Sequence, residues 1–216
     1  MKVINRNFLK IIAVIAMFLD HLGKIFFPDV LFLQVIGRIS FPIFAFFIAE
    51  GYFYTKSRKK YFLTMLIFAI LSQPVYYFAF SKIGLNILFT FAFSIILIYL
   101  LENVKRDKLI FSIYIIIYFI IFLMLDIFNF ISYEFAGIVL PLIFYFFRTS
   151  NLKYIIATIA LAFLSIFSVP YQFACIIAIP LLMLYNNKKG KYNLKYFFYT
   201  FYPLHLLVFA LIKLFI

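Results

Sequence analysis

The stretch "FLKIIAVIAMFLDHLGKIFF", residues 8–27, is a run of twenty residues of which only four are ionisable. A helix needs about 20 mostly apolar residues to cross the hydrocarbon core of a bilayer. Runs of similar length recur along the whole chain, and no polar region between them is long enough to fold separately. The sequence therefore predicts one integral membrane domain, residues 1–216.

The composition points to the same class of protein. Of the 216 residues, 68% are hydrophobic and 12% are charged, with a mean hydropathy of +1.13. A soluble domain is about half apolar and about one quarter charged. We therefore predict an all-α fold, a polytopic transmembrane bundle of about nine helices. The expected spans are 8–27, 31–54, 61–80, 85–101, 109–128, 133–148, 152–168, 171–185 and 194–215.

The positive charges predict the orientation of the bundle. Of the 20 basic residues, 16 fall at the N-terminus or in alternate loops, as expected if the N-terminus is cytoplasmic and the C-terminus lies outside. This basic face would contact anionic membrane lipids, which accounts for the net charge of +13 without nucleic acid. The lone Cys175 and the absence of a Cys/His cluster in the sequence predict neither a disulfide nor a metal site.

Ionisable side chains at membrane depth are functional candidates because an unpaired charge in lipid is costly. Lys10 and His21 are eleven residues apart, which places them on one helix face about 16 Å apart. Asp20 points about 100° away from His21 and can reach Lys24 instead. The six candidates are Lys10, Asp20, His21, Arg38, Glu50 and His205.

The second span returns antiparallel to the first and predicts two ion pairs, Asp20 with Arg38 and Lys10 with Glu50. These pairs either neutralise buried charge or serve a function, and both can hold together. His21 is left without an obvious partner, and a neutral imidazole at membrane depth suits a general base. His205 is a weaker candidate of the same kind. Pro42 cannot donate to the carbonyl of Arg38, so a kink is expected there.

Several long motifs resemble the TraX family, and they occur in the same order along nearly the whole chain. They are "LDHLG" (19–23), "IGRISFPIFAFFIAEGY" (36–52), "IFAILSQPVYYFAF" (67–80), "LNILFTF" (85–91), "LIFYFFR" (142–148) and "LYNNKKGKYNLKYFFYTFYPLHLLV" (184–208). The resemblance implies a multi-pass protein of the bacterial cytoplasmic (inner) membrane, in a family whose namesake acetylates the amino terminus of pilin subunits.

The spacing of Lys10 and His21 also resembles the basic-X10-His pattern of a wider group of transmembrane acyltransferases. There the histidine is taken as catalytic and acetyl-CoA as the acyl donor. The chain departs from the family where relatives tend to read "DYG", since it has Ser132, Tyr133 and Glu134 instead. That departure concerns the acceptor more than the donor.

The preferred hypothesis is an acetyl-CoA-dependent acetyltransferase acting on an amine or hydroxyl acceptor near the outer face. The acceptor could be a peptide, a pilin-like subunit or an envelope sugar. The predicted catalytic residues are His21 as base, Arg38 as oxyanion donor, and Asp20 and Glu50 as groups that set the charge of their neighbours. The predicted cofactor-binding residues are Lys10, Arg38, Lys56 and Arg58. The alternatives are a small transporter or proton-coupled permease, and a non-catalytic membrane subunit of a secretion or conjugation system.

Overall fold

The structure is a computed structural model that describes residues 2–103, 108–127, 134–166, 168–192 and 194–215. Apart from one bridge between Ile4 and Tyr185, these residues form helices and connecting loops, which confirms the predicted all-α fold class. The helices are α1 (Arg6–Phe26), α2 (Leu31–Gly37), α3 (Ser40–Tyr54), α4 (Arg58–Phe80), α5 (Ile87–Asn103), α6 (Lys108–Ile127), α7 (Glu134–Phe146), α8 (Leu152–Ile166), the 3-10 helix η1 (Pro170–Ile177), α9 (Ala178–Met183) and α10 (Lys195–Lys213).

Side-chain caps fix where two of the long helices begin. The side chain of Asn5 accepts a hydrogen bond from the backbone N–H of Phe8 at the start of α1. Ser57 does the same for the N–H of Lys60 at the start of α4. Each cap pairs a backbone donor that has no partner within the helix. The two helices therefore begin a few residues from the predicted starts of their spans.

The second predicted span is broken into α2 and α3 beside Arg38, as Pro42 predicts. α2 ends at Gly37 and α3 begins at Ser40. The eighth predicted span differs from a single α-helix, because η1 occupies its first half and α9 its second. Pro180 has no N–H for the carbonyl of Ile176, so regular α-helical bonding cannot run through that junction.

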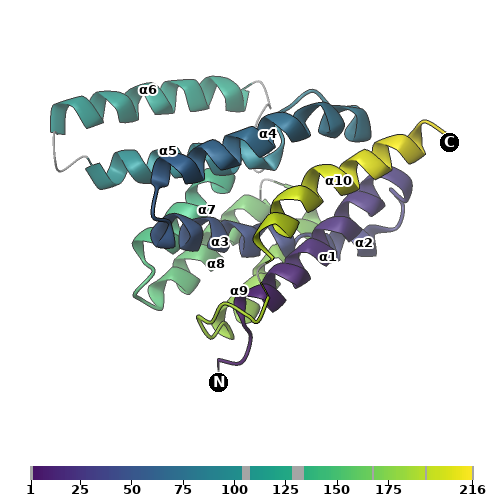
Figure 1. Cartoon of the computed structure of the whole chain (residues 1–216), viewed down its shortest axis with the longest axis horizontal. Coiled ribbons are helices and arrows are strands. Elements are labelled where there is room, and N and C mark those ends of the chain that lie inside the picture. The colour runs from purple at the N-terminus through teal and green to yellow at the C-terminus, as the bar shows by residue number, and fades with distance from the viewer. Residues whose placement is uncertain (1, 104–107, 128–133, 167, 193, 216) are drawn as a thin grey trace.

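Helix α3 lies at the centre of the bundle and packs against α1, α5, α7 and α9. Its side chains Phe41, Phe46 and Tyr52 are buried in the main hydrophobic cluster. Figure 1 shows α6 at the edge, where it packs on α5. Large apolar side chains of α6, among them Ile116 and Leu123, are exposed. In a membrane protein such a surface faces lipid.

Two glycines allow α1 and α2 to cross closely. A Cβ added at Gly37 would overlap Asp20 and lie 2.7 Å from its Oδ1 atom. A Cβ at Gly23 would lie 2.9 Å from the Cβ of Leu33. Small residues at helix crossings let backbones approach in this way. The crossing places Asp20 directly against the α2–α3 break.

The first and last segments of the chain are tied to loops predicted on the same side of the membrane. The N–H of Ile4 donates to the carbonyl of Leu184 at 3.0 Å, and the N–H of Asn186 donates to the carbonyl of Ile4 at 2.9 Å. At the other end of the bundle, Nζ of Lys213 donates to the carbonyl of Ala79 at 3.2 Å. These contacts agree with the predicted grouping of loops, whereas the side that faces the cytoplasm stays a prediction.

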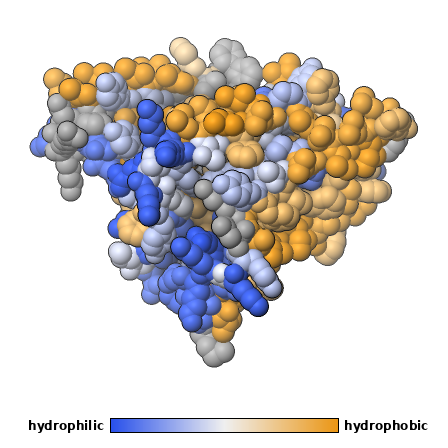
Figure 2. All heavy atoms as spheres, in the orientation of Figure 1, coloured by the Kyte–Doolittle hydropathy of each residue, from blue (hydrophilic) through white to orange (hydrophobic). Residues whose placement is uncertain are grey.

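Three helical stretches among the described residues are long and apolar enough to cross a membrane: Leu31–Tyr54, Arg58–Phe80 and Tyr196–Lys213. Of the other predicted spans, the first, which forms α1, carries more charge, and the helices of the fourth, sixth, seventh and eighth are shorter than 18 residues. Figure 2 shows hydrophobic residues covering the right-hand side of the molecule, around α10 and α2, while hydrophilic residues gather towards the N-terminus. The molecule therefore has the surface division of a membrane protein.

Candidate functional site

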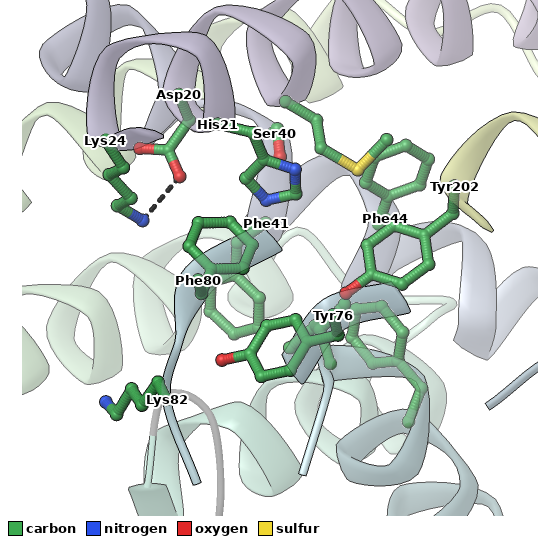
Figure 3. Close-up of a pocket in the computed structure, with 13 residues that line it drawn as sticks. Asp20, His21, Lys24, Ser40, Phe41, Phe44, Tyr76, Phe80, Lys82 and Tyr202 are labelled. Carbon is green, nitrogen blue, oxygen red and sulfur yellow. Dashed lines mark hydrogen bonds and ion pairs between the residues drawn. The ribbon is translucent and has the colours of Figure 1, made fainter. Parts of the chain in front are cut away.

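A cavity of about 250 Å³ opens among α1, α3, α4, α5 and α10 and includes His21 in its wall (Figure 3). Most of its walls are aromatic, with charged groups on one side. The lining residues are Met17, Asp20, His21, Lys24, Ser40, Phe41, Phe44, Tyr76, Phe80, Lys82, Ile87, Phe91 and Tyr202. The cavity lies in the half of the bundle that the charge pattern predicts to be outer.

Asp20 is buried and forms two ion pairs. Its Oδ2 lies 2.5 Å from Nζ of Lys24, and its Oδ1 lies 3.1 Å from Nη2 of Arg38. The predicted pair of Asp20 with Arg38 and the predicted contact with Lys24 are both confirmed. Pairing with two cations offsets part of the cost of burying the carboxylate. Asp20 thus lowers the net positive charge of the cavity wall.

Arg38 contacts three side chains and does not line the cavity. Besides its contact with Asp20, its Nη1 donates to Oε1 of Gln172 at 3.0 Å. Its guanidinium also lies over the ring of Tyr171, 5.1 Å from the centroid. Arg38 is absent from the described lining of the cavity. At this position Arg38 can hold Asp20 in place but does not reach a molecule bound in the cavity.

His21 has a partner that the sequence did not reveal. Its Nδ1 lies 2.8 Å from Nε2 of His205, and the two rings are nearly parallel, with 11° between their planes and 5.0 Å between centroids. On the far side of His205, Nδ1 lies 2.7 Å from the carbonyl of Phe201. The rings of His21 and Phe80 are nearly perpendicular in the cavity wall, with 5.1 Å between centroids. The expectation that His21 lacks a structural partner was wrong.

The predicted pair of Lys10 with Glu50 is not among the ion pairs of the described residues. Nζ of Lys10 lies instead near the rings of Phe47 and Phe198, at 5.2 and 5.0 Å from their centroids. Cation–π contacts of this kind stabilise a partly buried ammonium. Periodicity places Lys10 and Glu50 at one depth but cannot fix the rotation of α3 against α1.

Cations from other elements act electrostatically on Glu50. Lys153, Arg6 and Arg148 are the charges that act on its carboxylate. It lies on α3 six residues beyond Phe44, the last α3 residue of the cavity wall, which is about 9 Å along the helix. The structure therefore places Glu50 apart from His21.

Two predicted cofactor-binding residues, Lys56 between α3 and α4 and Arg58 at the start of α4, lie in different surroundings. Lys56 is exposed. Arg58 forms an ion pair with Glu102, with 2.8 Å between Nη1 and Oε2, and stacks over Tyr52. Glu102 also accepts hydrogen bonds from Tyr52 and Tyr145. Of the predicted site residues, the structure brings Asp20, His21 and Arg38 together, and leaves Lys10, Glu50, Lys56 and Arg58 elsewhere.

Tyr76, Tyr202 and Lys82 are among the cavity residues that the sequence did not single out. Tyr76 and Tyr202 line the cavity, the ring centroid of Tyr202 lying 6.1 Å from that of His21, and Lys82 stands at its charged side. Among the 17 tyrosines of the chain nothing in the local sequence marks these two. Lys82 is one of the four basic residues outside the N-terminus and the loops predicted to be cytoplasmic. That placement was the available signal of a functional role. Of the family's altered motif, Ser132 and Tyr133 lie outside the described residues, and Glu134 begins α7.

Comparisons with known proteins agree over nearly the whole chain. The sequence matches the family model described as TraX protein over residues 5–213. It is 28% identical over 248 residues to the probable fimbrial assembly protein FimC, serogroup H1, of Dichelobacter nodosus, with 96% of this chain and 95% of that protein covered. No solved structure has significant similarity to it. Because the family match extends from the start of α1 to the end of α10, the chain belongs to the TraX family.

Proposed function

We propose that this protein is a membrane acetyltransferase of the bacterial cytoplasmic membrane that moves an acetyl group from cytosolic acetyl-CoA to an amine or hydroxyl acceptor. The observation that carries the proposal is the position of His21. An imidazole stands in the wall of a largely aromatic cavity, beside the paired charges of Asp20 and Lys24. A base held in an aromatic-lined site beside fixed charges suits acyl transfer.

In the proposed reaction His21 removes a proton from the acceptor as the acceptor nitrogen or oxygen attacks the thioester carbonyl carbon. A new C–N or C–O bond forms, and the C–S bond to CoA then breaks. The departing thiolate takes the proton back from His21, so the enzyme returns to its starting state. General base catalysis of this kind contributes about 10²- to 10⁴-fold to a rate.

The negative charge that develops on the carbonyl oxygen needs a donor at the cavity wall. Lys24 lines the cavity and Arg38 does not, so the proposal gives this role to Lys24. Arg38 then acts by holding Asp20, which in turn holds Lys24. Fixed donors aimed at a developing oxyanion are a large contribution to catalysis in acyl transfer.

The cavity suits the reactive end of acetyl-CoA and the end of an acceptor, whereas the nucleotide portion is too large for about 250 Å³. The proposal places that portion at the basic face of the bundle, near Lys10. The eleven residues between Lys10 and His21 correspond to about 16 Å, a distance the extended pantetheine arm can span. Lys56 is a further candidate for the phosphates because it is exposed. Arg58 is a weaker one because Glu102 neutralises it.

The relative from Dichelobacter nodosus is named for fimbrial assembly. By analogy, we propose a peptide acceptor related to surface fibres, such as a pilin-like subunit, ahead of an envelope sugar. The N-terminus of this protein would be cytoplasmic and the cavity would open towards the outer side of the membrane. The grouping of 16 of the 20 basic residues supports this orientation.

The test is an assay of purified protein in lipid nanodiscs with radiolabelled acetyl-CoA, scored for transfer to peptide and sugar acceptors and for hydrolysis. His21→Phe keeps an aromatic ring in the cavity wall and removes the base. Lys191→Ala, an exposed loop change, is the matched control. We expect the first variant to lose roughly 10²-fold or more of the rate while the control keeps it. A wild-type rate in His21→Phe would contradict the mechanism.

A proton-coupled permease is the second candidate, favoured by two hydrogen-bonded histidines at membrane depth. It predicts a flux into liposomes that does not depend on acetyl-CoA. Measurement of proton flux beside the acetyl-transfer assay separates the two functions, since each predicts a signal that the other lacks.

A further inference from the structure

We propose that His205 is a positioning residue that fixes the tautomer of His21 and thereby directs the unprotonated Nε2 of His21 into the cavity. The inference rests on the geometry of three groups in a row. They are the carbonyl of Phe201, the ring of His205 and the ring of His21, joined by contacts of 2.7 and 2.8 Å. Both distances lie within the range of ordinary hydrogen bonds.

The direction of the chain of hydrogen bonds follows from its first member. A backbone carbonyl can only accept, so Nδ1 of His205 must carry the hydrogen that it shares with Phe201. In a neutral imidazole the other nitrogen is then an acceptor, so Nε2 of His205 has a lone pair. The hydrogen between the two rings therefore belongs to Nδ1 of His21. It follows that Nε2 of His21 carries no hydrogen and can accept a proton.

Packing holds both rings in these orientations. His205 is only 5% exposed and is stacked on one side against Phe201, with 4.9 Å between ring centroids. Phe209 meets its edge at 5.7 Å. On the cavity side, Phe80 meets His21 nearly perpendicularly at 5.1 Å. These aromatic neighbours restrict rotation of both rings and so favour one hydrogen-bond pattern.

The arrangement gives His205 a role in the proposed proton transfer. When His21 accepts a proton at Nε2, its Nδ1–H still donates to the lone pair of His205. His205 in turn donates to the carbonyl of Phe201, so the dipoles of both acceptors point their negative ends towards the new charge. No proton leaves either Nδ1 atom. His205 would thus orient the base and stabilise its protonated form without contacting the substrate.

Nitrogen NMR tests the assignment directly, because the chain contains two histidines in all. In protein labelled with ¹⁵N-histidine, each neutral imidazole reports which nitrogen carries the hydrogen. We expect both histidines to be Nδ1–H tautomers in the wild type. A wild-type spectrum with His21 as the Nε2–H tautomer would overturn the proposal, whatever the protein's activity.

Two variants of His205 separate positioning from packing. In His205→Gln the side-chain carbonyl oxygen can still accept from Nδ1 of His21, whereas in His205→Leu no acceptor remains. Resting on the acetyltransferase proposal, we expect His205→Leu to lower kcat by about 10²-fold with an unchanged KM for acetyl-CoA. This is less than the roughly 10⁴-fold loss when the charged orienter of a serine-protease histidine is replaced. His205→Gln should recover most of the rate.

Equal kcat in His205→Leu and wild type would contradict the positioning role. If His205→Leu does not fold, the comparison of His205→Gln with wild type in the NMR experiment still decides, since His21 should keep its Nδ1–H form. If the wild type shows the expected tautomers but no acetyl transfer, the tautomer assignment stands and the acetyltransferase proposal fails. The two proposals can therefore fail separately.

Discussion

Two clusters of ionisable groups lie within the helices, and they differ in what remains open to a ligand. In the cluster around Glu102, the carboxylate binds Arg58 and accepts from Tyr52 and Tyr145. In the cluster around His21, Nδ1 of His21 is bound to His205, and the same side chain lines a cavity. A buried charge alone therefore does not mark a candidate site. A buried group with unused hydrogen-bonding capacity beside a cavity does.

The largest effect is expected where the cavity cluster depends on Asp20. Asp20→Asn would leave the buried guanidinium of Arg38 without its counter-charge, and removing one partner of a buried pair costs about 3–5 kcal/mol. We expect a loss of this size in the free energy of unfolding, measured in mixed micelles with increasing SDS. The double variant Asp20→Asn/Arg38→Gln should recover part of it. A single variant as stable as wild type would show that the pair contributes nothing.

The next effect tests the close crossing of α1 and α2 beside the cavity. Gly37→Ala places a methyl group against the backbone and Cβ of Asp20, and overpacking of this kind costs about 1–3 kcal/mol. In Gly51→Ala the new methyl would meet the hydroxyl end of Tyr61 instead, and a side-chain end can move. We therefore expect Gly37→Ala to unfold at a lower SDS fraction than Gly51→Ala. The reverse order would contradict the proposed crossing.

The Glu102 cluster should affect stability and leave acetyl transfer unchanged. Glu102→Gln keeps an acceptor for one tyrosine and loses the charge that faces Arg58, which is half exposed. We expect a loss of about 1–2 kcal/mol in unfolding free energy. The rate of acetyl transfer, corrected for folded protein, should match wild type. A selective loss of rate would move Glu102 into the functional site and remove the contrast between the clusters.

The smallest effect concerns Lys10, which shares a helix with His21 but lies outside the described lining of the cavity. Lys10→Gln removes the charge proposed to hold a CoA phosphate. We expect KM for acetyl-CoA to rise about tenfold, which corresponds to 1.4 kcal/mol, with kcat unchanged. Lys2→Gln, at an exposed position near the same end, is the control. An equal effect in both variants would indicate general attraction by the basic face.

The sequence predicted those features that depend on local chemistry. Hydrophobic runs marked the helices, Pro42 marked the break between α2 and α3, and the spacing within α1 placed Lys24 within reach of Asp20. The 3-10 form of η1 was not predicted, because an apolar run does not distinguish 3-10 from α-helical bonding.

The features that escaped prediction depend on contacts between distant parts of the chain. His21 and His205 are 184 residues apart, and the sequence of neither segment indicates that α10 packs beside α1. The rotation of α3 likewise decided that Lys10 meets Phe47 and not Glu50. Membrane depth can be estimated from position along a span, whereas the facing direction of a side chain depends on the neighbouring helices.

The pairing of the first helix with the last has a consequence for synthesis of the protein. His21 lies in α1, whereas its partner His205 lies in α10 and is synthesised 184 residues later. During translation the histidine pair cannot assemble until α10 has been inserted beside α1. A product released early by the ribosome would carry the cavity residues of α1 without the second imidazole. Synthesis through α10 is thus a condition for assembling the histidine pair.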